Sequence, residues 1–197
     1  WACHANDAAT VFNEVKDMDN AIKVAYEFYK KHPKETLIVV TADHETGGIV
    51  LGTGKYALNL KALQHQKHSA DGLSKRISEL RKSKGNKVTW EDMKTFLGEE
   101  MGFWKQFPIS WEQEKKLRDE FEKSFIKNKV VFAESMYSKS EPMAACAKEV
   151  MDEISMVGWV SGGHVPVFAI GAGSHLFSEK IDNTEIPKRI AKAAGYK

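Results

Sequence analysis

The sequence predicts an α/β fold in which a mostly parallel sheet is flanked by helices and carries an inserted helical cap. Two observations support this prediction. The run from Thr36 to Thr41 is short, apolar and rich in β-branched residues, which is typical of a strand buried on both faces of a parallel sheet. The order of expected elements (helix, strand, several helices, strand, helix) is typical of a sheet-and-helix sandwich that carries an insertion.

The first part of the chain, residues 1–54, is predicted to belong to the α/β core. A helix is expected to begin near Asp17, a suitable N-cap, because apolar residues then recur at helical spacing. His32-Pro33 is expected to end that helix, since proline cannot continue it. The buried strand follows, and Ile49–Leu51 is expected to form a further short strand.

The middle part, residues 55–157, is rich in Lys and Glu and is predicted to form the helical cap. One helix is expected from Leu58 to Arg81, and others are expected to open at Thr89, at Ser110 and at Ser140-Glu141-Pro142, which all carry capping signals. The aromatic residues concentrated here are expected to form the core of the cap: Trp90, Phe103, Trp104, Phe107 and Trp111.

The last part, residues 158–197, returns to the α/β core. Val165–Ile170 is expected to form a strand, with Pro166 near its start. A terminal helix is expected from Thr184 to about Ala194, because Gly195 supplies a C-terminal stop.

The composition excludes some classes of partner. The net charge is +2 over 197 residues, so no strong field points to nucleic acid. The sequence has no apolar run long enough to span a membrane. The two cysteines, Cys3 and Cys146, do not indicate a disulfide framework and are better interpreted as small apolar residues than as a bridge.

Asp43 and His44 are the strongest candidates for chemistry. They directly follow the apolar strand, and ligands of open α/β sheets bind beyond the carboxyl ends of strands. A carboxylate and an imidazole are good zinc ligands, although the same pair could be a simple hydrogen-bonded pair at a strand end. Thr46-Gly47-Gly48 then allows the backbone to turn sharply.

Other histidines are weaker candidates when taken alone. His4 lies in a short polar segment before the first helix, and His164 lies at the amino end of the last strand, where a surface histidine is the simpler interpretation. His65 and His68, spaced by three on one expected helix, could chelate a metal, but a solvated face explains them better.

Three segments together resemble the C-terminal portion of bacterial-type alkaline phosphatases. Residues 41–48, TADHETGG, resemble the motif around the family's adjacent Asp-His zinc ligands. Residues 1–7, WACHAND, and residues 159–164, WVSGGH, resemble the segments that hold two histidines of the other zinc. The helical middle fits the variable insertion of bacterial members, and residues 165–187 resemble the family's last strand and helix.

The resemblance implies specific metal ligands. Asp43 and His44 would bind one zinc, and His4 and His164 would bind the other. The family's auxiliary magnesium has its ligands outside this chain. The family hydrolyses phosphate monoesters through a phosphoserine or phosphothreonine intermediate. Its nucleophile is expected upstream of Trp1, so no catalytic nucleophile is assigned within this chain.

The resemblance also implies a setting for the protein. Its substrates would be small phosphate monoesters, its location periplasmic or secreted, and a homodimer would be allowed, as in the family. The chain alone is expected to be inactive. Two alternatives stay open: another member of the wider two-metal superfamily, such as a phosphodiesterase or sulfatase, and a non-catalytic structural domain. One departure from the family pattern is that His164 abuts Val165, where the family usually has a few more residues.

Overall fold

The computed structural model describes residues 1–197 except 55–56, 86, 128–132, 135–138, 161 and 197. The chain divides into two compact units. The helical unit comprises residues 1–13 and 47–160, and the sheet unit comprises residues 14–46 and 161–197. The boundaries of these two units differ from the boundaries of the three predicted parts, which are residues 1–54, 55–157 and 158–197. The division into three parts stays a prediction.

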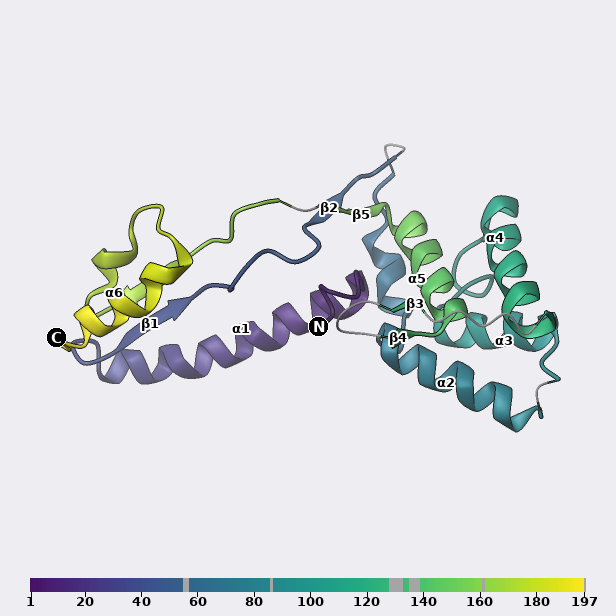
Figure 1. Ribbon diagram of the computed structural model, residues 1–197, viewed down its shortest axis with the longest axis horizontal. Helices are drawn as coiled ribbons and strands as arrows, with labels where there is room; N and C mark the ends of the chain where they lie inside the picture. Colours follow the sequence, from purple (N-terminus) through teal and green to yellow (C-terminus); the bar gives the residue numbers. More distant parts are fainter. Residues whose placement is uncertain (55–56, 86, 128–132, 135–138, 161, 197) are drawn as a thin grey trace. The chain divides into compact units, whose positions relative to one another are not determined.

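The main helices of the helical unit are drawn in teal and green in Figure 1. They are α2 (Ala70–Ser83), α3 (Trp90–Glu100), α4 (Trp111–Phe121) and α5 (Pro142–Ser155). Both α2 and α4 pack against α5. A 3-10 helix, η1 (Leu60–His65), also packs on α5, and a π-helical turn, η2 (Glu122–Ile126), continues α4. The fully buried side chains of this unit include Leu73, Ile77, Met93, Leu97, Met101, Phe103, Leu117, Met143 and Val150.

Local signals set the starts of three of these helices, as predicted. Thr89 and Asp92 form a reciprocal capping box at α3, and Ser110 and Gln113 form another at α4. Glu141 caps α5, and the proline that follows occupies its first turn. Each device satisfies backbone N–H groups that a helix N-terminus otherwise leaves unpaired.

The prediction of one helix from Leu58 to Arg81 is wrong. The segment is broken between η1 and α2, because the Ser69 side chain accepts a hydrogen bond from Gly72 N (3.2 Å) and starts a new helix. His65 and His68 therefore do not share a helix. His68 Nδ1 instead lies 2.6 Å from a carboxylate oxygen of the buried Glu100.

The aromatic core is confirmed for four of its five predicted members. Trp90 and Phe103 are buried, and Trp104 and Phe107 pack partly buried against the core. Trp111 is 73% exposed, so its placement in the core is wrong. It is the first residue of α4, and the buried face of that helix is instead supplied by Leu117 and Phe121.

Two short antiparallel ladders complete the helical unit. One joins β2 (Ile49–Leu51) to β5 (Val157–Trp159). The other joins β3 (Ala133–Glu134) to β4 (Lys139–Ser140). The first ladder confirms the predicted strand after Gly48 and ties it to the segment that follows α5.

The sheet unit is built on β1 (Leu37–Val40) and β6 (Phe168–Gly171), which pair with Val40 opposite Phe168. The α/β class is confirmed, but the ladders among the described residues are all antiparallel rather than mostly parallel. The residues of β1 are half-buried, not enclosed on both faces. An apolar β-branched run indicates a strand, but it does not encode the direction of the neighbouring strand.

Helices cover this ladder. In Figure 1 the purple helix α1 (Ala8–Lys31) runs beside β1, and its Tyr29 ring would lie 3.2 Å from a Cβ placed on Gly171. After β6, two 3-10 turns, η3 (Ser174–Phe177) and η4 (Asn183–Glu185), lead into α6 (Ile186–Ala193). The predicted terminal helix is thereby confirmed, with Gly195 just beyond it at φ 76°.

The predicted start of the first helix near Asp17 is wrong. Helix α1 begins at Ala8, and Asp7 caps it by accepting a hydrogen bond from Thr10 N (3.3 Å). The missed signal is the sequence Asp7-Ala8-Ala9, which places a strong cap before two good helix formers. The predicted stop holds, because α1 ends at Lys31, just before His32-Pro33.

Cys3 and Cys146 are both free thiols, as expected. Burial raises the pKa of the Cys146 thiol to about 12, so this cysteine behaves as an apolar core residue. Among the described residues, no helix combines the length and the apolar character that crossing a membrane requires.

Candidate metal centre

Asp43 and His44 emerge just beyond the carboxyl end of β1, as predicted. The two side chains are exposed, and His44 Nε2 lies 3.5 Å from Asp43 Oδ2. His44 Nδ1 lies 2.7 Å from the carbonyl oxygen of Glu45, and a carbonyl can only accept, so Nδ1 carries a proton and donates it. That bond fixes the tautomer and directs the lone pair of the neutral ring to Nε2, on the side of the Asp43 carboxylate.

The electrostatic setting of His44 follows from these contacts. The Glu45 carbonyl, which accepts from the ring, raises the pKa of His44 above its ordinary value, and the Asp43 carboxylate adds to the increase. Asp43 Oδ1 also accepts a hydrogen bond from His44 N (3.0 Å), which restrains the two side chains in one local turn.

Glu45 anchors the loop that follows. Its Oε1 accepts a hydrogen bond from Gly162 N (2.7 Å), so the TADHETGG segment is fastened to the segment that leads to His164. Its Oε2 is buried and has no hydrogen-bond partner among the described residues. A buried carboxylate oxygen normally requires a partner, so this oxygen marks a place where a cation or a donor would be stabilised.

The glycine pair makes the expected sharp turn. Gly47 and Gly48 have φ values of 73° and 46°. A Cβ on Gly48 would lie 2.2 Å from Val160 O, so no larger residue fits there without a shift of the backbone.

His164 lies at the same end of the β1–β6 ladder as Asp43 and His44. The antiparallel register pairs the carboxyl end of β1 with the amino end of β6, and Thr41 Oγ1 donates to Pro166 O (3.1 Å) just beyond the ladder. The predicted strand start at Val165 is wrong: β6 begins at Phe168. Pro166 explains the later start, because proline has no N–H to donate to a ladder.

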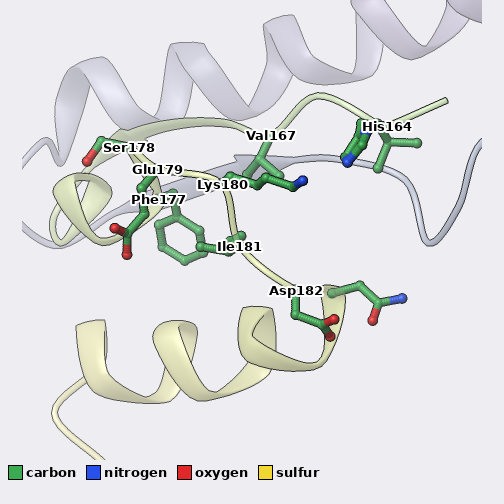
Figure 2. Close-up of a pocket in the computed structure, with 10 residues that line it drawn as sticks. His164, Val167, Phe177, Ser178, Glu179, Lys180, Ile181 and Asp182 are labelled. Atoms are coloured by element: carbon green, nitrogen blue, oxygen red, sulfur yellow. The ribbon is translucent and has the colours of Figure 1, made fainter.

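His164 also lines a pocket of about 1000 Å³ within the sheet unit. Figure 2 shows His164 at one end and Glu179 at the other, with Phe177 and Ile181 between them. Asn183 lines this pocket too, and its Nδ2 donates to Asp43 O (3.3 Å). Asn183 therefore connects the Asp43 loop with the wall of the His164 pocket. Sequence reasoning missed this residue, because its only signal is a position just before the terminal helix.

His4 lies in the helical unit, in a compact N-terminal turn. Ala5 N donates to Trp1 O (3.1 Å), Asn6 N to Cys3 O (3.0 Å) and Asp7 N to Ala2 O (3.0 Å). The predicted partnership of His4 with His164 joins residues of two different units, so it stays a prediction.

A zinc site in a protein needs nitrogen, sulfur or oxygen donors from at least three side chains. Asp43 and His44 fit it in chemistry and in tautomer, and the Glu45 carbonyl supplies the usual second interaction of a metal-bound histidine. Across the described part of the chain, however, no three His, Cys, Asp or Glu side chains are close enough to hold a metal ion together. The residues thus fit two positions of a site that needs at least three protein ligands.

Comparisons with known proteins agree on one family. The family profile for alkaline phosphatase matches residues 1–196. Alkaline phosphatase 3 of Bacillus subtilis is 32% identical over 211 residues, which cover 100% of this chain and 38% of that protein. Alkaline phosphatase 4 of the same organism is 30% identical over 197 residues, covering 98% of this chain and 36% of that protein.

A solved structure gives the same result for the fold. The crystal structure of a cold-active alkaline phosphatase from a psychrophilic Shewanella species superimposes with a TM-score of 0.69 at 26% identity. The match covers 98% of this chain and 42% of that one. The chain therefore spans well under half the length of the relatives that it matches.

Proposed function

Because this chain belongs to the alkaline phosphatase family, we propose that it supplies part of the two-zinc centre of a phosphate monoester hydrolase. Asp43 and His44 bind one zinc, and His4 and His164 contribute to the other. The observation that carries the proposal is the geometry at the end of β1. There His44 donates from Nδ1 to the Glu45 carbonyl and turns Nε2 toward Asp43.

Each residue has a separate task in this proposal. The Asp43 carboxylate provides charge, and the His44 ring provides a neutral nitrogen whose direction the Glu45 carbonyl sets. The Gly162 N–H holds Glu45, and thereby keeps the loop of His44 beside the segment of His164. Zinc ions held by these residues would supply Lewis-acid chemistry, which favours both the attacking and the leaving oxygen of a phosphoryl displacement.

The nucleophile of the proposed phosphoseryl or phosphothreonyl intermediate is outside this sequence. Ser174 opens the 3-10 turn η3 in a context unlike the family's nucleophile segment, and Ser161 lies outside the described residues. The auxiliary magnesium is likewise bound by residues that this chain does not supply. We therefore expect the 197-residue chain to be inactive alone, and the parent enzyme to be periplasmic or secreted and able to form a homodimer.

The test uses the full-length protein that contains this chain. Phosphate release from an aryl phosphate and zinc binding by calorimetry are measured for the wild type, Asp43→Ala and His44→Ala. The matched control is His175→Ala, which removes an exposed histidine of the same unit away from the loop. We expect both loop variants to lose zinc binding at one site and to lose turnover by at least 100-fold, and the control to behave as wild type.

Other substrates in the same assay separate the alternatives. A preference for phosphate diesters or sulfate esters over monoesters would assign the protein to another branch of the two-metal superfamily. If the wild type shows neither zinc binding nor turnover, the chain is a structural domain and the proposal is wrong.

A further inference from the structure

The carboxylate of Asp7 is buried where two helices begin. Its residue is only 1% exposed, yet Oδ1 accepts hydrogen bonds from Thr10 N (3.3 Å) and Gln66 Nε2 (2.7 Å). Oδ2 accepts from Thr10 Oγ1 (2.8 Å) and from Ala70 N (2.7 Å). Thr10 lies in the first turn of α1, and Ala70 is the first residue of α2. One side chain thus joins the amino ends of two helices.

These contacts explain how a carboxylate is tolerated in the interior. Removing a carboxylate from water costs free energy unless hydrogen bonds replace the lost solvation. Four donors replace it at Asp7. The amino ends of both helices also carry positive partial charge, which favours a carboxylate at this place. Asp7 is therefore held firmly, and it fixes the start of α1 against the helical unit.

The turn that contains His4 ends at that anchor. Asp7 N donates to Ala2 O (3.0 Å), which closes the turn on both sides of His4. Asn6, between His4 and the anchor, adopts a left-handed φ of 50°, a conformation that costs free energy unless the surroundings enforce it. Backbone hydrogen bonds within the turn and the anchored Asp7 side chain at its end hold this conformation together.

The same turn contacts the segment that follows the Asp-His pair. A Cβ added to Gly47 would lie 2.7 Å from Asn6 Oδ1 and 3.1 Å from Cys3 O, so the two backbones are in close contact. These residues all belong to the helical unit. The turn is thus restrained from one side by Asp7 and from the other by Gly47.

We propose that Asp7 is a positioning residue for the metal centre. It holds the turn of His4 against Gln66 and the start of α2, so that the helical unit controls how His4 is presented to zinc. The inference rests on the proposed function, because it assumes that His4 is a zinc ligand. The competing interpretation is that Asp7 contributes only to folding stability.

The experiment compares two buried caps in the zinc-loaded full-length protein. Asp7→Asn keeps the shape and one acceptor oxygen. The matched control is Glu141→Gln, because Glu141 is 2% exposed, caps α5 by accepting from Met143 N (2.7 Å), and lies in the same unit. Thermal unfolding, zinc affinity and the visible absorption spectrum of the cobalt-substituted protein are measured for each.

We expect both variants to lower the melting temperature, but only Asp7→Asn to change the metal site. Its zinc affinity should fall about tenfold, which is a typical loss when a residue that supports a metal ligand is replaced. Its cobalt spectrum should shift, because the geometry of the His4 nitrogen changes, whereas Glu141→Gln should keep both wild-type values.

Three results would overturn the inference. The first is an Asp7→Asn protein with wild-type zinc affinity and cobalt spectrum, which leaves the proposed function intact. The second is an equal loss of affinity in Glu141→Gln, which indicates a general effect of stability. The third is a wild type without zinc, which overturns the proposed function as well.

A milder variant covers the case in which Asp7→Asn does not fold. Gln66→Met removes one of the four donors to the carboxylate, together with the hydrogen bond from Gln66 Nε2 to His68 O (3.0 Å), and keeps the size of the side chain. We expect a loss of zinc affinity of about threefold, smaller than that of Asp7→Asn. An unchanged affinity in this variant would then contradict the inference.

Discussion

The helical unit and the sheet unit bury their apolar side chains to very different extents. Phe103 of the helical unit is fully buried, whereas Phe168 of the sheet unit is 64% exposed. The exposed apolar side chains of the sheet unit also include Val24 and Phe28 of α1, and an apolar cavity of about 450 Å³ lies beside Leu37. The helical unit therefore supplies its own core, while the sheet unit, which carries three of the four proposed ligands, does not.

The largest expected contrast comes from one phenylalanine in each unit. Phe103→Ala should lower the free energy of unfolding by about 4 kcal/mol, because it leaves a cavity in a closed core. Phe168→Ala should change it by less than about 0.5 kcal/mol, because that ring is mostly in solvent. Denaturant unfolding followed by circular dichroism measures both.

Tryptophan fluorescence shows whether a loss of stability occurs in the helical unit. All five tryptophans lie in the helical unit, so this signal follows that unit alone. Similar losses of stability in Phe103→Ala and Phe168→Ala would contradict the claim that only the helical unit has a closed core.

The next effect concerns the glycine pair beside the proposed ligands. Gly48→Ala should destabilise the protein by about 3 kcal/mol, because the new Cβ meets Val160 O as well as an unfavourable positive φ. Gly52→Ala is the control: its φ is 81°, but the added Cβ meets nothing within 4 Å, so only the backbone cost of about 1 kcal/mol remains. Equal melting temperatures for the two variants would show that the contact with Val160 is unimportant.

The smallest effect compares a helix-capping carboxylate in each unit. Hydrogen bonds from Thr89 N and its hydroxyl lower the pKa of Asp92 to about 2, and hydrogen bonds from Thr184 lower the pKa of Asp182. Because the folded-state value lies below the ordinary value of 3.8, the stabilisation by Asp92 is complete above about pH 4. It is lost as the pH falls toward 2.

Asp92→Asn should therefore weaken the acid dependence of unfolding in this window. Carboxyl carbon chemical shifts in an NMR titration report both groups directly. If Asp92 or Asp182 titrates at its ordinary value, the corresponding cap is not formed in solution. If only one of them does so, the two units differ in their local structure as well as in their cores.

Much of the local structure could be predicted from the sequence. The caps at Thr89, Ser110 and Glu141, and the end of α1 at His32-Pro33, depend on residues within one helical turn of each other. The break at Ser69 and the start of α1 at Ala8 were predicted wrongly. Ser69 caps α2, and the first residue of α2 donates to the buried Asp7 carboxylate. Asp7 also caps α1. The spacing of apolar residues, from which both helices were predicted, contains no information on these caps.

Asp43 and His44 could be placed after a strand from the sequence alone, because the apolar run and the two residue types that zinc prefers are local features. The position of His164 at the same end follows from the fold, because the amino end of one strand meets the carboxyl end of another only in antiparallel pairing. Thr41 and Pro166, which contact each other beside this site, are 125 residues apart in the chain. Strand direction depends on such distant contacts, whereas propensity and capping act between near neighbours, so the local pattern could not reveal it.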